Sequence, residues 1–390
     1  MSALIVGFAR TPFAKMNGAL SRVTAVNLGA HAISAALINA GIDAESVDYV
    51  YGGQVLQGGA GQNPARQAAV IAGIPLSTPA MTLNAVCLSG IEAIAAGVRL
   101  IEAGEADVVV AVGQESMSLA PHAWVGSRGG KKYGPVTMID TLEFDGLTDA
   151  FELRSMGAST EDYIYPLGIS RSSQDALAAL SHQNADASEN FISDEIAPFE
   201  IVGRNGSQIL AKDDGIRPET TEETLAKLRP AFGADGTITA GNSSQLTDGA
   251  AAVILMSEAK AHELNTQGIA KVLSTAFVSG PDYSLHSQPS NAIKAAMSRV
   301  QLRISDLKAV EINEAFAAVG VQSTKDLGID PAIVNVHGGA IALGHPIGAS
   351  GVRIVGHLAR TIQQLGSGQI GAAGICGGGG QGSAVVLESV

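Results

Sequence analysis

The chain has 390 residues, of which 46% are hydrophobic and 16% are charged, and its formal net charge is −13. This length exceeds one ordinary core and the composition is well buried, so two or three compact units are expected. The acidic balance argues against nucleic acid as a partner, because phosphate binding needs clustered Lys and Arg. The two cysteines cannot form a disulfide framework, and no zinc-type spacing is present.

Neither a signal-peptide pattern nor an apolar run of membrane-spanning length is visible in the sequence. We therefore expect a soluble, cytoplasmic enzyme that does not bind membranes and holds no metal.

The first part of the chain predicts a strand, a loop, a helix and a second strand. Residues 46–54 have a polar start, a short strand-like run and then a loop. Residues 91–103 carry apolar residues every three or four positions and end near Gly104, as helices often do. Residues 107–113 then form a continuous apolar run typical of a buried strand.

Residues 117–246 interrupt this pattern. They contain the only Trp, Trp124, a basic glycine-rich patch at 127–132, and stretches punctuated by Pro and Gly. One helix is predicted around 171–190, with Ser172 and Ser173 as candidate N-caps. We interpret this region as an inserted loop domain, and long loops inside compact proteins usually bind something.

The last part of the chain repeats the first at an offset of about 260 residues. Residues 306–314 resemble 46–54, and Gly348-Ala349-Ser350-Gly351 aligns with Cys87-Leu88-Ser89-Gly90. A predicted helix over 352–365 ends near Gly366, and a buried strand is predicted over 369–375. The shared order predicts two related α/β units with mixed, buried sheets.

Cys87 directly precedes a predicted helix. Free backbone N–H groups and the helix dipole would lower the pKa of its thiol and favour a nucleophilic thiolate. The competing interpretation is a buried structural cysteine, which is common in cytosolic proteins.

Three further residues have settings that suit chemistry. Cys376 follows a buried strand and precedes four glycines, which allow a ligand to approach and present N–H groups to it, although a tight packed turn is the alternative. His345, between Gly344 and Pro346, could act as the base for a cysteine. Asn313 follows a predicted strand and could hold a water or donate to an oxyanion, or simply form a turn. His337 more plausibly supports a turn.

Together these segments resemble the thiolase family. The resemblance rests on Cys87, Asn313-Glu314-Ala315-Phe316, Gly344-His345-Pro346 and the Cys376 glycine loop, in this order, and on matches at 113–118, 227–232, 248–251 and 348–351. It covers residues 1–390 without a large gap, and within the family the acetyl-CoA acetyltransferases are the most similar.

The resemblance implies an α/β thiolase-like fold with two duplicated halves. Each half would hold a mixed five-stranded sheet, and the layers would stack as α-β-α-β-α. The N-terminal half would span 1–116 and be completed by 247–268, the loop domain 117–246, and the C-terminal half 269–390. In relatives the segment around 128–132 bridges dimers into tetramers, so a homotetramer, a dimer of dimers, is expected.

The implied reaction is the reversible Claisen condensation of two acetyl-CoA molecules to acetoacetyl-CoA and CoA. By the match, Cys87 becomes acylated with His345 activating it, and Cys376 moves the proton at the substrate Cα. One oxyanion site would combine His345 with a water on Asn313, and another the N–H groups of Cys87 and Gly378. No cofactor is required, because the CoA thioesters are themselves the substrates.

The same match suggests a set of substrate-binding residues. Those expected around CoA and the acyl group are Arg217, Ser244, Phe232, Ala240, Met156, Ala315 and Phe316. Ser155, where short-chain members often have His or Asn, leaves the chain-length preference open.

Three alternatives remain. A 3-ketoacyl-CoA thiolase of fatty-acid β-oxidation, acting on longer chains, would share every catalytic residue. A β-ketoacyl-carrier-protein synthase has a related fold, but a second catalytic cysteine such as Cys376 is a thiolase feature. A non-catalytic acyl-CoA-binding protein would have no need of Cys87, His345 and Cys376 together.

Overall fold

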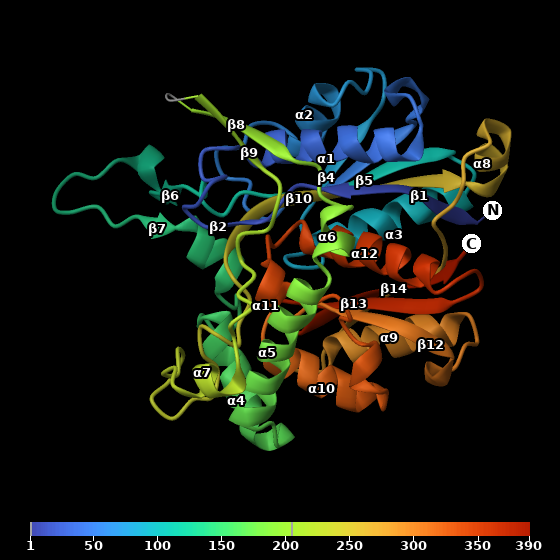
Figure 1. The fold of residues 1–390 in the computed structure, drawn as a ribbon. Coiled ribbons are helices and arrows are strands. Elements are labelled where there is room, and N and C mark those ends of the chain that lie inside the picture. The colour runs from blue at the N-terminus through green and yellow to red at the C-terminus, as the bar shows by residue number, and fades with distance from the viewer. Residues whose placement is uncertain (1, 204–205) are drawn as a thin grey trace.

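The computed structural model describes residues 2–203 and 206–390, so residue 1 of the predicted N-terminal half and residues 204–205 of the predicted loop domain lie outside it. Helices and sheets alternate in five layers (Figure 1). The layer order is the α-β-α-β-α stack that was expected, and the α/β fold class is confirmed.

The upper sheet in Figure 1 belongs to the N-terminal half. Its strands run in the order β4-β3-β5-β10-β1, with β3 parallel to β4 and β5 and the other pairs antiparallel. Two outer helices, α1 and α2, cover it. The bounds are β1 Ala3–Arg10, β3 Tyr49–Gly53, β4 Ala80–Leu83, β5 Val108–Glu115, β10 Thr247–Ser257, α1 Ala25–Ala40 and α2 Pro64–Ile71. Short elements β2 (Ala14–Lys15) and α8 (Glu258–Leu264) flank β10.

The lower sheet repeats this pattern in the order β12-β13-β14-β11. Here β12 and β13 are parallel and the other pairs are antiparallel. The bounds are β11 Ala270–Ser279, β12 Leu307–Ile312, β13 Ile370–Gly377, β14 Gln381–Ser389, and outer helices α9 Gln288–Arg299 and α10 Ala317–Leu327. The expected fifth strand is reduced to an isolated parallel bridge between Val310 and Val334. The sheets join where Ala3–Ile5 of β1 pairs with Ala270–Val272 of β11.

Two helices, α3 (Ser89–Glu102) and α12 (Ser350–Gln364), form the central layer between the sheets. Their apolar side chains, including Ile91, Ile94, Val355 and Leu358, are fully buried in one core with residues of both sheets. The helices approach closely at their first turns. A Cβ on Gly351 would lie 2.3 Å from the Ile91 nitrogen, and one on Gly90 would lie 2.7 Å from the Gly348 oxygen. Any larger side chain would separate the two helix starts.

The period of apolar residues in the sequence predicted both ends of each helix to within two residues. Each begins two residues earlier than predicted, at a serine whose hydroxyl donates to a preceding carbonyl, Pro346 O for Ser350 and Val86 O for Ser89. Each is followed closely by the predicted glycine with positive φ, Gly104 or Gly366.

Among the described residues, 117–246 contribute no strand to the central sheet. Their elements are β6 His122–Ala123, β7 Ile139–Asp140, η3 Leu142–Leu147, α4 Met156–Leu167, α5 Arg171–Ala187, α6 Glu189–Ser193, β8 Phe199–Gly203, β9 Gly206–Leu210 and α7 Glu222–Ala226. The predicted caps of α5 were wrong. Ser170 is the N-cap, because its hydroxyl accepts from the Ser173 nitrogen. The boundaries at 116, 246 and 268 stay predictions.

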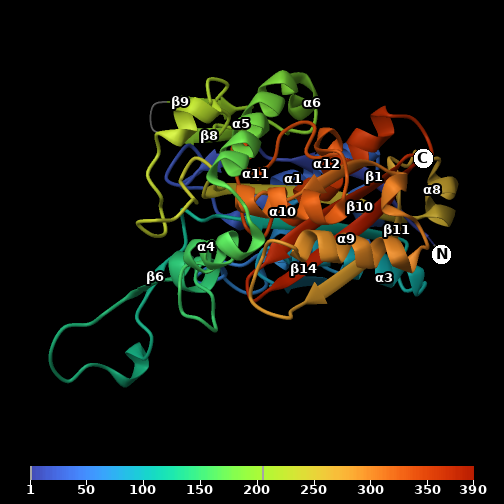
Figure 2. The ribbon, with the colours of Figure 1, turned by 90° about the horizontal axis from the view of Figure 1, so that it is seen from below.

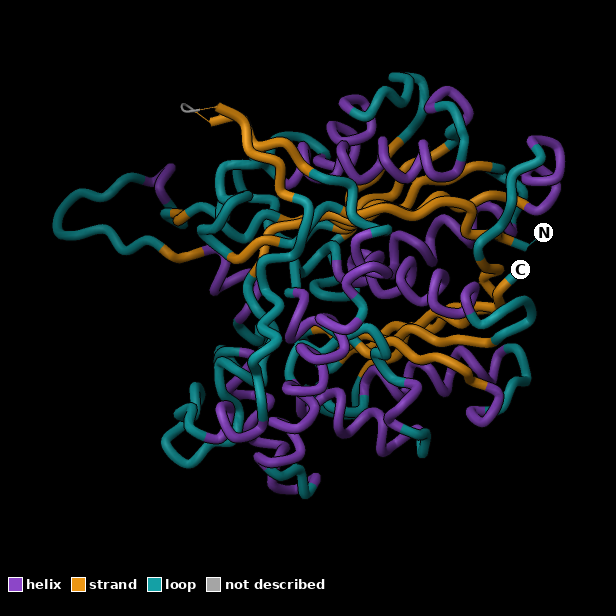
Figure 3. The backbone as a smooth tube through the Cα atoms, in the orientation of Figure 1, coloured by secondary structure: helices purple, strands orange, loops and turns teal. Residues whose placement is uncertain are grey.

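The segment between β6 and β7 projects from the body as a long arm (Figures 1 and 2). Residues 125–138 are all exposed, including Val125 and Tyr133. The backbone tube in Figure 3 shows that most of this arm is loop. Across the described part of the chain, no helix is both long and apolar enough to span a bilayer.

Candidate active site

A cavity of about 60 Å³ lies where α3 begins and β13 ends. It brings together eight of the residues singled out from the sequence: Cys87, His345, Cys376, Gly378, Met156, Ser244, Ala315 and Phe316. Its remaining lining comes from apolar and glycine residues: Val86, Gly146, Leu147, Leu285, Ile347 and Gly377. Cys376 lies 289 positions and His345 258 positions after Cys87 along the chain. Two thiols and one imidazole from distant parts of the sequence therefore meet at one small cavity.

The loop that presents Cys87 is tightly fixed. Val86 has a φ of 52°, a left-handed conformation that strains a β-branched residue. The Ser89 hydroxyl donates to the Val86 carbonyl at 2.6 Å and accepts from the Ala85 nitrogen at 2.9 Å. The Asn84 side chain also accepts from the Val86 nitrogen at 3.0 Å. These bonds hold the strained turn that points the cysteine at the cavity.

The expectation that the helix start would lower the Cys87 pKa was wrong. Burial raises the pKa of the thiol to about 12, and the negative charge of Glu115 acts in the same direction. The backbone N–H groups of Cys87 and Gly378 donate to the sulfur and oppose this rise, but they do not outweigh desolvation. The free protein therefore holds Cys87 as a neutral thiol at neutral pH.

Cys376 is the last residue but one of β13 and is almost completely buried. Burial raises the pKa of its thiol, as does the nearby Cys87. A Cβ on Gly377 would lie 2.7 Å from Leu88 Cγ, so a glycine here lets the end of β13 reach the start of α3. The following Gly379 and Gly380 both have positive φ and turn the chain back into β14.

His345 has one fixed and one free ring nitrogen. Nδ1 lies 2.5 Å from Ser350 Oγ, and that hydroxyl lies 3.1 Å from the Pro346 carbonyl. When the hydroxyl donates to the carbonyl, Nδ1 carries the proton and donates to the serine. Nε2, which has no hydrogen-bond partner among the described residues, then presents its lone pair. Burial and the charge of Arg353 lower the His345 pKa to about 4, so the ring is neutral and able to accept a proton.

Asn313 lies at the end of β12 and does not line the cavity. Its side chain is fully buried, and within the part of the chain that the structure describes neither amide atom has a hydrogen-bond partner. A buried amide of this kind is suited to holding a water. The adjacent Glu314 is also buried, and its carboxylate accepts from Ser181, Asn335 and the Ile341 nitrogen.

The remaining predicted CoA residues lie outside the cavity. Phe232 packs edge to face on Phe316 at 6.1 Å and so continues the apolar wall outward. Ala240 and Arg217 are exposed. Gln245 connects Arg217 to the site, because its amide bonds Arg217 and its backbone carbonyl accepts from the His345 nitrogen. Ser155 does not line the cavity either, and it caps α4 instead.

Sequence reasoning missed Glu115 and Ser350 as individual residues. The buried Glu115 carboxylate accepts from the Val55, Leu56 and Gly348 nitrogens at 2.9–3.0 Å, which ties the loop after β3 to the His345 loop. Burial raises its pKa to about 7 although the three N–H groups oppose this. A charged residue two positions after the apolar run 107–113 was a usable signal. Ser350 lay within a matched segment, but only the structure shows that it holds His345.

Among the described residues, no cluster of three or more His, Cys, Asp or Glu side chains could hold a metal ion. The groups at the cavity that suit chemistry are the two thiols, the neutral imidazole and backbone N–H donors.

Sequence comparisons identify the family. Residues 3–259 match the thiolase N-terminal domain and residues 266–389 match the thiolase C-terminal domain. The chain belongs to the thiolase family. The family resemblance and the prediction of an acyltransferase enzyme are thus confirmed.

Similar proteins support this assignment over the full length. A probable acetyl-CoA acetyltransferase of Mycolicibacterium smegmatis is 54% identical, with 99% of this chain and 100% of that protein covered. The acetyl-CoA acetyltransferase of Shinella zoogloeoides is 46% identical, with 100% and 99% covered. The human mitochondrial 3-ketoacyl-CoA thiolase structure superposes with a TM-score of 0.95 at 37% identity, covering 100% of this chain and 99% of that one.

Proposed function

We propose that this thiolase is an acetyl-CoA C-acetyltransferase, which interconverts two acetyl-CoA molecules with acetoacetyl-CoA and CoA. The observation that carries the proposal is the meeting of Cys87, His345 and Cys376 in one small cavity, with the N–H groups of Cys87 and Gly378 directed at the nucleophilic sulfur. The names of the relatives agree with it.

In the proposed thiolysis, Nε2 of His345 takes the Cys87 proton as the sulfur attacks the 3-keto carbon of acetoacetyl-CoA. The C2–C3 bond then breaks, leaving an acetyl group on Cys87 and the enolate of acetyl-CoA. The Cys376 thiol protonates this enolate at Cα. The Cys376 thiolate next removes the proton of CoA, whose sulfur attacks the acetyl-Cys87 carbonyl. The second acetyl-CoA leaves and Cys87 recovers its proton from His345.

Two donor groups would stabilise the developing oxyanions. The Cys87 and Gly378 N–H groups would serve the acyl-cysteine, and His345 with a water on Asn313 would serve the thioester enolate. Removing one donor of this kind costs about 3–4 kcal/mol of transition-state stabilisation. No metal or redox cofactor enters any step.

The small cavity favours short acyl groups. Its volume of about 60 Å³ is small for a ligand site, and the apolar side chains of Met156, Leu285 and Ile347 limit the room for a longer acyl chain. The alternative, a 3-ketoacyl-CoA thiolase for longer chains, is favoured by the likeness to the human mitochondrial structure. Thiolysis of 3-ketoacyl-CoAs of increasing length separates the two. We expect kcat/KM to be highest for the four-carbon substrate and to fall as carbons are added, and a steady rise to ten carbons would select the alternative.

For CoA we propose a path from the cavity along Phe316 and Phe232 to the exposed Arg217 and Ala240. Ser244 would lie at its inner end, because its nitrogen bonds the Ala315 carbonyl at 3.0 Å. Arg217→Ala should raise the KM for CoA several-fold and leave kcat unchanged if the arginine pairs with a CoA phosphate.

We also propose a homotetramer in the cytoplasm. The support for assembly is the projecting arm, whose exposed Val125, Tyr133 and Met138 form no core of their own. Deleting residues 127–133 should convert a tetramer to a dimer in light scattering after size-exclusion chromatography. An unchanged mass would refute the role of the arm.

A further inference from the structure

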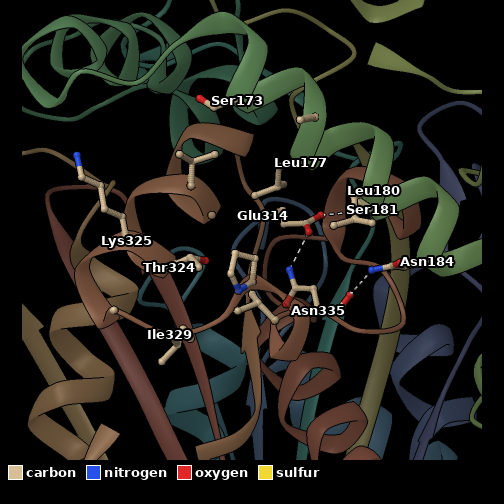
Figure 4. Close-up of a pocket in the computed structure, with 16 residues that line it drawn as sticks. Ser173, Leu177, Leu180, Ser181, Asn184, Glu314, Thr324, Lys325, Ile329 and Asn335 are labelled. Atoms are coloured by element: carbon tan, nitrogen blue, oxygen red, sulfur yellow. Dashed lines mark hydrogen bonds between the residues drawn. The ribbon is translucent and has the colours of Figure 1, made fainter. Parts of the chain in front are cut away.

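A second pocket, of about 470 Å³, lies between α5 and α10 and shares no lining residue with the candidate active site. Figure 4 shows α5 above it and α10 beside it. This volume is within the range of small-molecule sites in proteins. It is several times larger than the reactive cavity, and the proposed reaction makes no use of it.

The walls of this pocket are apolar. Leu177 and Leu180 approach from α5, Val321 from α10, and Ile329 and Val334 from the segment that follows α10. Leu180 is 44% exposed, although it belongs to a helix whose other apolar residues are largely buried. A molecule that enters here would therefore shelter apolar surface from water.

The inner part of the pocket is closed by Glu314. Its carboxyl group is buried and accepts from Ser181 at 2.7 Å and Asn335 at 2.7 Å (Figure 4). It also accepts from the Ile341 nitrogen at 3.1 Å. Burial raises its pKa. A carboxyl group with three donors already in place has little need of a further partner. The inner end is thus suited to an uncharged, apolar group.

The outer part of the pocket carries a positive charge. Lys325, in the last turn of α10, is exposed and pairs with no carboxylate among the described residues. Figure 4 shows its ammonium group on one side of the pocket, well separated from Glu314. The hydroxyl-bearing Ser173 lines the same pocket from the first turn of α5. An anionic group would be attracted to this side.

We propose that the pocket between α5 and α10 binds a small amphiphilic carboxylate. The apolar chain would lie between Leu177 and Val321 with its end toward Glu314, and the carboxylate would pair with Lys325. The hydrogen-bonded Glu314 at the inner end and the exposed Lys325 at the outer end select this orientation, since the reverse placement would take the carboxylate away from the lysine.

A ligand in this pocket would contact Asn335, the residue that helps to position Asn313. Asn335, which lines the pocket, holds both backbone groups of Ile312 at 2.9 Å and also donates to Glu314. The residues on either side of Asn313 are therefore bonded to one pocket residue. A ligand here would pack against the contacts that fix Asn313, without entering the reactive cavity.

Isothermal titration with octanoate tests the proposal on the whole protein. We expect saturable binding that weakens at least tenfold in Ala176→Phe, which fills the pocket from α5, and in Thr324→Phe, which fills it from α10. The matched control is Ala187→Phe, an exposed position of α5 that does not line the pocket, and it should bind as the wild type does. Having two filling variants on different helices keeps the test valid if one of them fails to fold.

The head-group assignment needs a second comparison. Lys325→Gln should weaken octanoate binding by about twofold to fivefold, since an exposed ion pair contributes up to about 1 kcal/mol. The same variant should not change the binding of octan-1-ol. Absence of octanoate binding to the wild type, or binding by both filling variants that equals binding by the wild type, would overturn the site. Unchanged octanoate binding in Lys325→Gln would overturn the proposed orientation. The heat of binding does not depend on the proposed reaction, so the two proposals can fail separately.

Discussion

Ser89 and Ser350 begin the two central helices at corresponding places in the two halves, and their hydroxyls have different tasks. Each donates to a carbonyl three or four residues back, Val86 or Pro346. In the N-terminal half the oxygen then accepts from the Ala85 backbone and shapes the strained turn before Cys87. In the C-terminal half it contacts His345 Nδ1. One duplicated helix start thus holds a nucleophile and the other its base.

The close approach of the helices at Gly90 and Gly351 brings the nucleophile and its base to the same place. Because the two helix starts touch backbone to backbone, the turns that precede them face the same cavity. The duplication therefore supplies two different reactive groups to one space from related local structures. The following predictions test whether the two helix starts have separate roles.

Removing the nucleophile should have the largest effect. Cys87→Ala should lower kcat for acetoacetyl-CoA thiolysis by about 10⁴-fold or more, because no covalent intermediate can form. Intact mass after incubation with acetyl-CoA should show one acetyl group on the wild type and none on the variant. An acetyl group that maps to Cys376 in the wild type would reverse the assigned roles.

Cys376→Ser should separate the two half-reactions. A hydroxyl is a far weaker base than a thiolate, so proton transfer at Cα should slow by about 10²–10⁴-fold. Acetylation of Cys87 by acetyl-CoA should slow less, because the CoA thiolate can leave without a proton from Cys376. Deuterium exchange into the methyl group of acetyl-CoA provides the measurement. Normal exchange in the variant would point to another base, with His345 the first candidate.

Ser350→Ala should disturb His345 while leaving Cys87 in place. Without the hydroxyl, Nδ1 loses its bond to Ser350 and the ring can rotate, and misplacement of this size can cost about 100-fold in kcat. The KM for acetoacetyl-CoA should change little. Ser350→Thr, which keeps the hydroxyl, should restore most of the rate. If the alanine and threonine variants lose equal activity, packing rather than the hydrogen bond is responsible.

Much of this arrangement could be predicted from sequence and some could not. The period of apolar residues predicted α3 and α12, and the family motifs named the groups that line the cavity. The pKa of Cys87 was predicted in the wrong direction, because a helix start visible in sequence was weighed without the burial that only the fold creates. The caps of α5 were missed for a similar reason, since Ser170, Ser172 and Ser173 are indistinguishable until the backbone is known.

The pKa values of the two reactive groups are shifted in opposite directions from their ordinary values. Cys87 has a pKa raised to about 12 and His345 one lowered to about 4, so both are neutral near pH 7. Alkylation of Cys87 by iodoacetamide in the free protein should therefore rise about tenfold per pH unit from pH 7 to 10. A plateau near pH 7 would indicate a preformed thiolate–imidazolium pair and contradict the structure.

The same shifts determine how stability depends on pH. Between pH 6.5 and about 4 the unfolded state protonates His345 and the folded state does not, so this group destabilises the fold as pH falls through that window. Between pH 9 and about 12 the unfolded state loses the Cys87 proton and the folded state keeps it, so stability also falls as pH rises there. Urea unfolding across these windows measures both slopes.

Ser89→Ala should have the smallest effect on chemistry and act mainly on stability. The Ala85 nitrogen would lose its acceptor and the strained φ of Val86 would lose one restraint, so unfolding should become easier by about 1–3 kcal/mol. Cys87 would still be followed by α3 and still receive the N–H groups of Cys87 and Gly378, and kcat should fall only a few-fold. Urea unfolding and thiolysis rates on Ser89→Ala and Ser350→Ala form a matched pair. The first should lose more stability than rate and the second more rate than stability, and the opposite ranking would show that the two serines do not have the separate tasks assigned here.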